Sequence, residues 1–134
     1  MRKAFLGMII LVFIGVVACE SQTSHDPIDA LQFSEMIASD QHGIILDVRT
    51  PAEYMEGHIP DAINMNYYDD SFESELDKLD KDKAYFVYCT VGGRSGSVTT
   101  IMIEKGFKHV HDLLGGIDSW ETNGLPITSG KDKE

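Results

Sequence analysis

Short apolar runs alternate with helix-like patterns along the chain after residue 28. The runs expected to be buried strands are residues 44–46, 62–63, 84–88 and 110–111, and the helical patterns lie at about residues 33–39, 51–55, 71–79 and 97–105. Strands that alternate with helices predict an α/β fold with a mostly parallel central sheet and helices on both of its faces. In such sheets the functional site lies beyond the carboxyl ends of the strands.

One cysteine stands at such a strand end. Cys89 directly follows the apolar run 84–88, and the segment Thr90-Val91-Gly92-Gly93-Arg94-Ser95 leads from it towards a helical pattern. Glycines allow the loop backbone to curl round the sulfur, and a helix N-terminus offers unpaired N–H groups and the positive end of its dipole. These groups lower the pKa of a thiol, which is about 8.5 in free cysteine. We therefore predict that Cys89 is a thiolate nucleophile held by the amides of residues 90–95.

An inert, packed Cys89 is the alternative, because free cysteines are among the most buried residues. The glycines, the arginine at position 94 and the strand-to-helix junction favour the reactive interpretation. That interpretation requires the thiol not to be sealed in the interior, and it requires the loop amides to point at the sulfur.

Residues 1–18 have the features of an export signal. Arg2 and Lys3 precede an uncharged run of 15 residues, and a membrane-spanning helix needs about 20. The small residue before Cys19 resembles the lipobox of bacterial lipoproteins, which implies a lipid on Cys19 and an anchor in a bacterial membrane, on its periplasmic or outer face. A plain secretory signal or an uncleaved anchor is the alternative.

The rest of the chain has the length of one compact domain. We expect a lipidated Cys19 and a flexible tether over residues 19–27, the domain over residues 28–128 and a polar tail over residues 129–134. The chain of 134 residues has a net charge of −11, and removal of the two positive charges in residues 1–18 gives −13. This acidity argues against nucleic acid as a partner, because phosphate contacts need clustered Lys and Arg. No histidine spacing is typical of a metal site.

Three motifs in order resemble those of the rhodanese-like family of sulfurtransferases, over about residues 28–127. Residues 47–54 with 57–64 are similar to the family's first signature, residues 89–95 to its active-site loop, and residues 114–117 with Trp120 to its C-terminal motif. The resemblance implies that Cys89 takes a sulfane sulfur from a small donor as a persulfide and passes it to a thiol or cyanide, with ping-pong kinetics. It implies no metal and no organic cofactor.

Other motif residues have two interpretations each. Arg94 either binds an anionic donor or fixes the loop through hydrogen bonds. Asp47 and Arg49, after the strand at residues 44–46, are expected to brace the site, and a peripheral salt bridge is the alternative. His58 is expected to tie a turn together rather than to act as a general base.

The chain also departs from the family pattern. Asp61 stands where the family often has glycine, and Gly96 where it often has alanine. Because Arg94 is the loop's one cation, a doubly charged donor such as thiosulfate would be attracted weakly. Near the C-terminus we expect Gly115 and Gly116 to form a tight turn or a close packing contact, and Trp120 to lie in the core.

Two other functions compete with sulfur transfer. Phosphatases and arsenate reductases of the same fold place one residue more between cysteine and arginine, so the shorter loop here suits a single sulfur atom better than a phosphate. The second is a non-catalytic or slow sulfur-carrier or interaction module that serves an exported redox protein.

Overall fold

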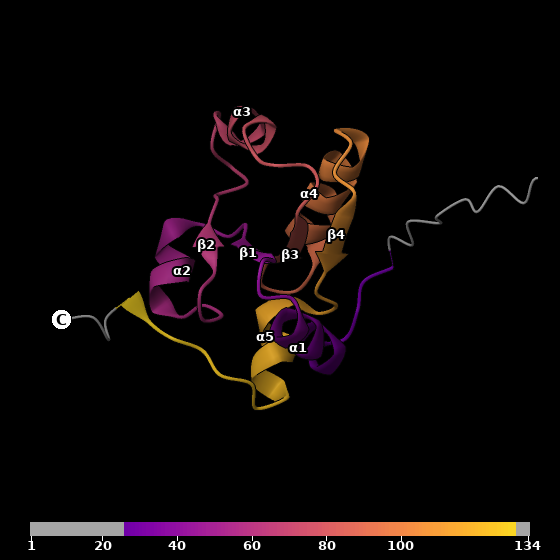
Figure 1. The fold of residues 1–134 in the computed structure, drawn as a ribbon. Coiled ribbons are helices and arrows are strands. Elements are labelled where there is room, and N and C mark those ends of the chain that lie inside the picture. Colours follow the sequence, from indigo (N-terminus) through magenta and orange to yellow (C-terminus); the bar gives the residue numbers. More distant parts are fainter. Residues whose placement is uncertain (1–25, 131–134) are drawn as a thin grey trace, which may run out of the picture.

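The computed structural model describes residues 26–130, which fold into nine helices and strands (Figure 1). The elements are, in chain order, α1 (Ala30–Ser39), β1 (Ile44–Asp47), α2 (Pro51–Glu56), β2 (Ile63–Asn64), α3 (Phe72–Asp77), β3 (Ala84–Tyr88), α4 (Gly93–Glu104), β4 (His109–Asp112) and α5 (Gly116–Thr122). The expected signal, Cys19, most of the tether and residues 131–134 lie outside the described residues. No helix among residues 26–130 is both long and apolar enough to cross a membrane.

The four strands form one parallel sheet in the order β2-β1-β3-β4. In its centre β1 pairs with β3, so that Asp47 at the end of β1 lies beside Tyr88 at the end of β3. After β1 the chain continues to β2 on one side of this central pair, and after β3 it continues to β4 on the other side. The ends of β1 and β3 therefore form the switch point of the sheet, which is where parallel α/β sheets bind ligands. This confirms the predicted fold class.

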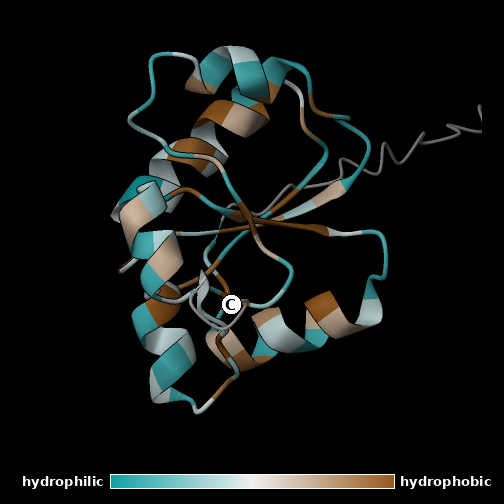
Figure 2. Ribbon diagram, turned by 90° about the vertical axis from the view of Figure 1, so that its left-hand side faces the viewer, coloured by the Kyte–Doolittle hydropathy of each residue, from teal (hydrophilic) through white to brown (hydrophobic). Residues whose placement is uncertain are grey.

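Alternating side chains divide the core into two layers, and Figure 2 shows helices on both sides of the sheet. Ile45, Phe86 and Tyr88 point towards α1 and α5 and pack with Phe33 and Trp120. The intervening residues point to the opposite face, which α3 and α4 cover; they are Leu46, Val48, Tyr85, Val87 and Cys89. Helices therefore cover both faces of the sheet, and the predicted core position of Trp120 is confirmed by its exposure of 3%.

Helices α4 and α5 differ most from the sequence prediction, and α1 begins at Ala30, three residues before its predicted start. Helix α4 begins at Gly93 rather than at residue 97, so that Arg94 and Ser95 belong to its first turn and not to the loop. Glycine lowers helix propensity, which is why the pattern placed the start too late. Helix α5 was not predicted at all, because its seven residues begin at Gly116, which has a positive φ like the preceding Gly115.

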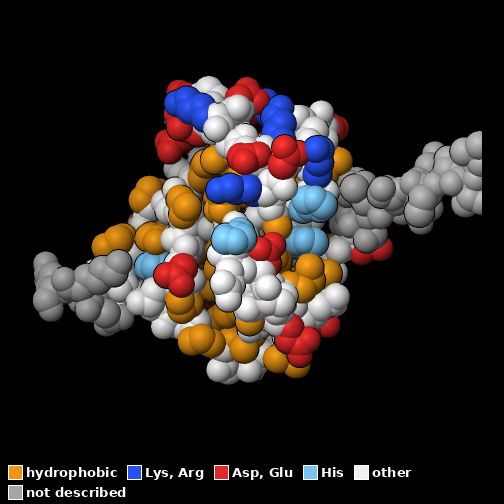
Figure 3. All heavy atoms as spheres, viewed as in Figure 1, with side chains coloured by type: hydrophobic (Ala, Val, Ile, Leu, Met, Phe, Trp, Pro, Cys, Tyr) orange, Lys and Arg blue, Asp and Glu red, His pale blue; other side chains and the backbone are white. Residues whose placement is uncertain are grey.

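The lysines of the described surface are mixed with carboxylates. Figure 3 shows blue and red side chains gathered at the end of the molecule that carries α3. Lys78 pairs with Glu75, Lys105 with Glu73 and Asp77, and Lys108 with Asp82.

Candidate active site

The loop after β3 turns its amides towards the sulfur of Cys89. The N–H of Gly92 donates to Cys89 Sγ over 3.1 Å. Gly92 makes this turn with a φ of 107°, which favours glycine, and α4 begins at the next residue. The predicted loop and the start of a helix thus meet at the sulfur.

Helix α5 holds the other side of the loop. The N–H of Ile117 donates to Cys89 O over 2.9 Å, and the N–H of Asp118 donates to Thr90 O over 3.2 Å. In a trans peptide the carbonyl and the following N–H point in opposite directions, so drawing the Thr90 carbonyl towards α5 turns the Val91 N–H away from it, towards the sulfur. A Cβ on Gly116 would lie 2.3 Å from Thr90 O and 2.5 Å from Cys89 O. The predicted close packing at Gly116 therefore occurs, and it is against the loop.

Two opposing effects act on the ionisation of Cys89. Burial favours the neutral thiol, but hydrogen bonds from the Ser95 side chain and from the amides of Ser95, Gly92 and Val91 favour the thiolate. Together these bonds outweigh burial and lower the pKa of Cys89. The loop thus stabilises negative charge on this sulfur.

The thiol itself is covered. Cys89 exposes 1% of its surface, because it continues the alternation of Tyr85 and Val87 and so faces α3 and α4. The requirement that the thiol be open is therefore not met in this conformation, although the requirement on the amides is. The loop residue Val91 is 66% exposed.

Arg94 is fully engaged by a carboxylate that the sequence analysis did not single out. Its Nη1 and Nη2 donate to Glu53 Oε2 and Oε1 over 2.9 and 2.7 Å, and Nη2 also donates to Thr90 Oγ1 over 2.8 Å. The Arg94 guanidinium lowers the pKa of Glu53, and Glu53 in turn raises that of Arg94. This geometry favours the second interpretation of Arg94, a residue that fixes the loop.

Glu53 owes its position to the start of α2. Thr50 caps this helix, the Glu53 N–H donates to Thr50 Oγ1, and the Thr50 N–H donates to Glu53 Oε2 in a capping box. Thr90 Oγ1 also donates to Glu53 Oε1. The spacing of Thr50 and Glu53 signals a helix start, but no local pattern pairs Glu53 with an arginine 41 residues away.

Asp47 and Arg49 form a buried brace at the end of β1. Arg49 Nη2 donates to Asp47 Oδ2 over 2.6 Å and to Gly57 O over 2.6 Å, while the hydroxyl of Tyr88 donates to Asp47 Oδ2 over 2.8 Å. Asp47 is fully buried and Arg49 is 5% exposed, so the pair is not a peripheral salt bridge. It ties the ends of β1 and β3 to the segment after α2.

His58 is engaged by its own turn. Its Nδ1 lies 2.8 Å from Tyr54 O, and its ring stacks on the Tyr54 ring with centroids 3.7 Å apart. Its backbone exchanges hydrogen bonds with Thr128. These contacts agree with the predicted structural role.

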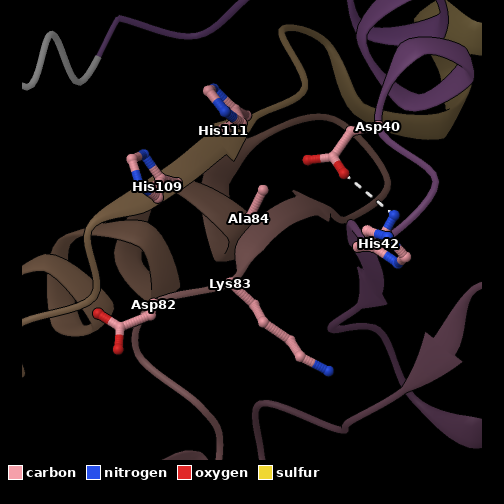
Figure 4. Close-up of a pocket in the computed structure, with 7 residues that line it drawn as sticks. All are labelled: Asp40, His42, Asp82, Lys83, Ala84, His109 and His111. Atoms are coloured by element: carbon pink, nitrogen blue, oxygen red, sulfur yellow. Dashed lines mark hydrogen bonds between the residues drawn. The ribbon is translucent and has the colours of Figure 1, made fainter.

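Three histidines, His42, His109 and His111, line a hollow at the edge of the sheet opposite Cys89. Figure 4 shows this hollow, of about 430 Å³, before the first residues of β3 and β4; its charged and imidazole side chains are Asp40, His42, Asp82, Lys83, His109 and His111. Among residues 26–130 no three His, Cys, Asp or Glu side chains are grouped so that they could hold a metal ion. The hollow is separate from the site at Cys89, which lies beyond the carboxyl ends of the strands.

A cavity of about 360 Å³ lies beside the Cys89 loop and is rich in carboxylates. Its polar lining comprises Arg49, Glu53, Glu56, Thr90, Asp118 and Glu121. Arg49 is paired with Asp47, so this cation is already neutralised.

Fold and site together define a class of protein: a parallel-sheet α/β domain with a cysteine held by amides where a central strand turns into a helix. The family description "Rhodanese-like domain" matches residues 29–123. The chain belongs to the rhodanese-like domain family.

Several of its relatives in this family are named sulfurtransferases. A sulfurtransferase of Allochromatium vinosum is 32% identical over 102 residues, which cover 76% of this chain and 94% of the relative. Thiosulfate sulfurtransferase GlpE of Coxiella burnetii is 36% identical over 80 residues, or 60% of this chain and 73% of the relative. The crystal structure of a rhodanese-related protein from Thermoplasma volcanium superimposes with a TM-score of 0.67 at 31% identity and covers 76% of this chain and 96% of that protein.

Proposed function

We propose that this protein is a rhodanese-type sulfurtransferase that carries sulfane sulfur on Cys89 as a persulfide. The observation that supports this most directly is the hydrogen bond from the Gly92 N–H to Cys89 Sγ, in a loop whose carbonyls are held by α5. Such preorganised donors stabilise negative charge on the reacting sulfur in both halves of the reaction. The names of the relatives point to the same chemistry.

The reaction divides into two displacements. In the first, the Cys89 thiolate attacks the sulfane sulfur of the donor, an Sγ–S bond forms, and the donor's leaving group departs with the electron pair of the broken bond. In the second, a thiolate or cyanide attacks the outer sulfur, and Cys89 Sγ leaves as a thiolate. The chain's own groups suffice for both steps, because the amides at Sγ stabilise the attacking and the leaving thiolate alike.

The charges around the loop favour a donor with little negative charge. Arg94 is neutralised by Glu53, and the neighbouring cavity is lined by Glu56, Asp118 and Glu121. A dianion such as thiosulfate meets repulsion there, whereas an organic persulfide with one negative charge meets less. We therefore expect faster loading from organic persulfides than from thiosulfate.

Intact-mass spectrometry tests the proposal. The purified protein is incubated with thiosulfate or with an organic persulfide, and Cys89→Ser is the matched control. The expected result is the addition of one sulfur atom, absent in the control, which thiols or cyanide remove in repeated cycles. Stable loading without turnover would indicate a sulfur carrier, and absence of loading from every donor would overturn the proposal. Turnover of an aryl phosphate that depends on Cys89 would assign a phosphatase instead.

We further propose that lipid on Cys19 anchors the domain to a bacterial membrane, with a protein partner there as one sulfur donor or acceptor. The support is the charged start, apolar run and small residue before Cys19 in the sequence. Metabolic labelling of expressing bacteria with an alkyne fatty acid is expected to label the wild-type chain but not Cys19→Ser. Equal labelling of both would refute the anchor.

A further inference from the structure

Three large apolar side chains are exposed around the Cys89 loop. Val91, in the loop itself, is 66% exposed, and Tyr68 and Leu114 are 66% and 54% exposed. Single exposed apolar residues are normal on a protein surface, but these three belong to segments that meet at one loop. We call Tyr68, Val91 and Leu114 the apolar rim.

Contacts with the loop region fix the place of the two outer residues. The centre of the Tyr68 ring lies 5.7 Å from the guanidinium carbon of Arg94, within the range of a cation–π contact. Leu114 directly precedes Gly115, and a Cβ on Gly92 would lie 3.7 Å from Gly115 N. The apolar rim therefore extends across the loop, from the segment between β2 and α3 to the segment between β4 and α5.

Two cavities with carboxylates adjoin the loop and the rim. The cavity of about 360 Å³ reaches the loop at Thr90, and a second cavity, of about 510 Å³, reaches the rim at Tyr68. Five exposed carboxylates that line these cavities have no ion pair among residues 26–130: Glu56, Asp118 and Glu121 in the first cavity, and Asp69 and Asp70 in the second.

The cations of the described domain do not balance this charge. Arg49 is paired with Asp47, and Arg94 with Glu53. The lysines of residues 26–130 follow α3 or α4, or precede β3 or β4, towards the edge of the sheet opposite Cys89; they are Lys78, Lys81, Lys83, Lys105 and Lys108. Figure 3 shows blue side chains above the pale blue histidines of that other side. The side that carries the rim is therefore negative.

We propose that the apolar rim and its two cavities form the docking surface for a protein that accepts sulfur from Cys89. The partner that fits has a thiol among apolar side chains, with Lys or Arg beside them: the apolar side chains cover the rim and the cations meet the carboxylates. The same carboxylates disfavour an anionic bilayer as the occupant. The partner's thiolate attacks the outer sulfur of the Cys89 persulfide, an S–S bond forms on the partner, and Cys89 leaves as a thiolate. The inference deepens the proposed function and rests on it.

Peptide disulfides test this surface without a sulfur donor. The full-length protein with Cys19→Ser, in which Cys89 is the remaining cysteine, reacts with two capped peptides whose cysteine is a 2-pyridyl disulfide between two leucines. One peptide ends in lysines on both sides and the other in glutamates. The Cys89 thiolate attacks the peptide sulfur, and thiopyridone leaves with the electron pair, so its absorbance gives the rate. Each rate is divided by that of 2-hydroxyethyl 2-pyridyl disulfide, which is small and neutral.

The charge of the peptide is expected to control the relative rate. The lysine peptide should react about tenfold faster than the glutamate peptide at low salt and about twofold faster at 0.5 M salt, because salt screens the carboxylates. Asp118→Asn with Glu121→Gln is expected to lower the low-salt ratio about threefold. The matched control, Glu35→Gln with Glu104→Gln, removes two exposed acids from α1 and α4 and is expected to follow wild type.

The rim itself is tested at Tyr68. Tyr68→Ser is expected to lower the relative rate of the lysine peptide about threefold, because apolar contact is lost, and Tyr68→Phe, which restores the ring, to recover it. Equal rates for both peptides at low salt, or an unchanged ratio after the change at Asp118 and Glu121, would overturn the proposal. Binding to phosphatidylglycerol vesicles that Tyr68→Ser weakens would assign the rim to the membrane and overturn it as well.

The small disulfide separates this inference from the proposed function. If it reacts with Cys89 and the two peptides do not differ, the docking surface is refuted and the nucleophile remains. If none of the three disulfides reacts, both the docking surface and the nucleophilic Cys89 are refuted.

Discussion

Gly116→Ala tests whether α5 sets the geometry of the reactive loop. The new Cβ would lie 2.3 Å from Thr90 O, which is 1.1 Å closer than the 3.4 Å at which ordinary contact begins. The loop and α5 therefore have to separate by roughly that distance. A comparable shift would stretch the 3.1 Å contact between the Gly92 N–H and Cys89 Sγ beyond hydrogen-bonding distance.

The loss can be estimated for both reactivity and stability. A hydrogen bond to a charged group contributes about 1.5–3 kcal/mol, and 1.36 kcal/mol corresponds to about one unit of pKa. We therefore expect the pKa of Cys89 to rise, and its alkylation rate below that pKa to fall about tenfold or more. The φ of Gly116 is 62°, which costs alanine about 1–2 kcal/mol, and overpacking adds about 1–3 kcal/mol to the loss of unfolding free energy.

Gly115→Ala is the matched control. Gly115 also has a positive φ, 74°, but its Cβ would meet the Ser119 side chain and not the loop. Both variants therefore carry backbone strain, and only Gly116→Ala moves the loop. Urea unfolding is expected to show both to be destabilised, while iodoacetamide alkylation as a function of pH is expected to be slowed much more in Gly116→Ala. A folded Gly116→Ala protein with the wild-type alkylation profile would refute a role of α5 in setting the loop.

Three further predictions concern an ion pair, a strained backbone position and a buried salt bridge. Arg94 holds the pKa of Glu53 below its ordinary value of 4.5 in the folded protein, so this ion pair stabilises the fold at neutral pH and is lost as the pH falls below about 4. The difference in urea stability between wild type and Glu53→Gln is therefore expected to close as the pH falls below that value. A difference that is unchanged at pH 3 would contradict this assignment. Asp61 has a φ of 64°, so Asp61→Gly is expected to raise the free energy of unfolding by about 0.5–1 kcal/mol, whereas Asp61→Ala is expected to lower it, because alanine tolerates a positive φ less well than aspartate; a rise in both variants in urea unfolding would contradict this. Arg49→Met leaves the fully buried Asp47 without its ion-pair partner and is expected to lower the free energy of unfolding by about 3–5 kcal/mol. The double variant with Asp47→Asn is expected to recover part of that loss. No recovery would show that the buried charge is not the cause.

The sequence was sufficient to predict the sheet and the place of Cys89 at a strand end. Residues 84–88 are apolar and short, and they form β3 over the predicted bounds. In the loop that follows, the sequence has a glycine at position 92, where the structure has a positive φ. Both signals are local, because hydrophobic periodicity and glycine act over a few residues.

Helix α5 and the partner of Arg94 were missed for a common reason. The first turn of α5 is fixed by its contacts with Cys89 O and Thr90 O, which lie more than 25 residues earlier in the chain. Glu53 meets Arg94 across 41 residues. Neither contact leaves a pattern in the nearby sequence, so a single sequence cannot reveal it.

The amino-acid sequence by itself determined the alternation of strands and helices, the strand end that bears Cys89 and the turn that follows it, because these depend on periodicity and backbone preferences of neighbouring residues. Only the tertiary structure decided that the thiol is covered, that α5 holds the carbonyls of the loop and that Glu53 neutralises Arg94. Burial and charge pairing depend on which distant segments come into contact, and that is fixed only when the sheet and its helices pack together.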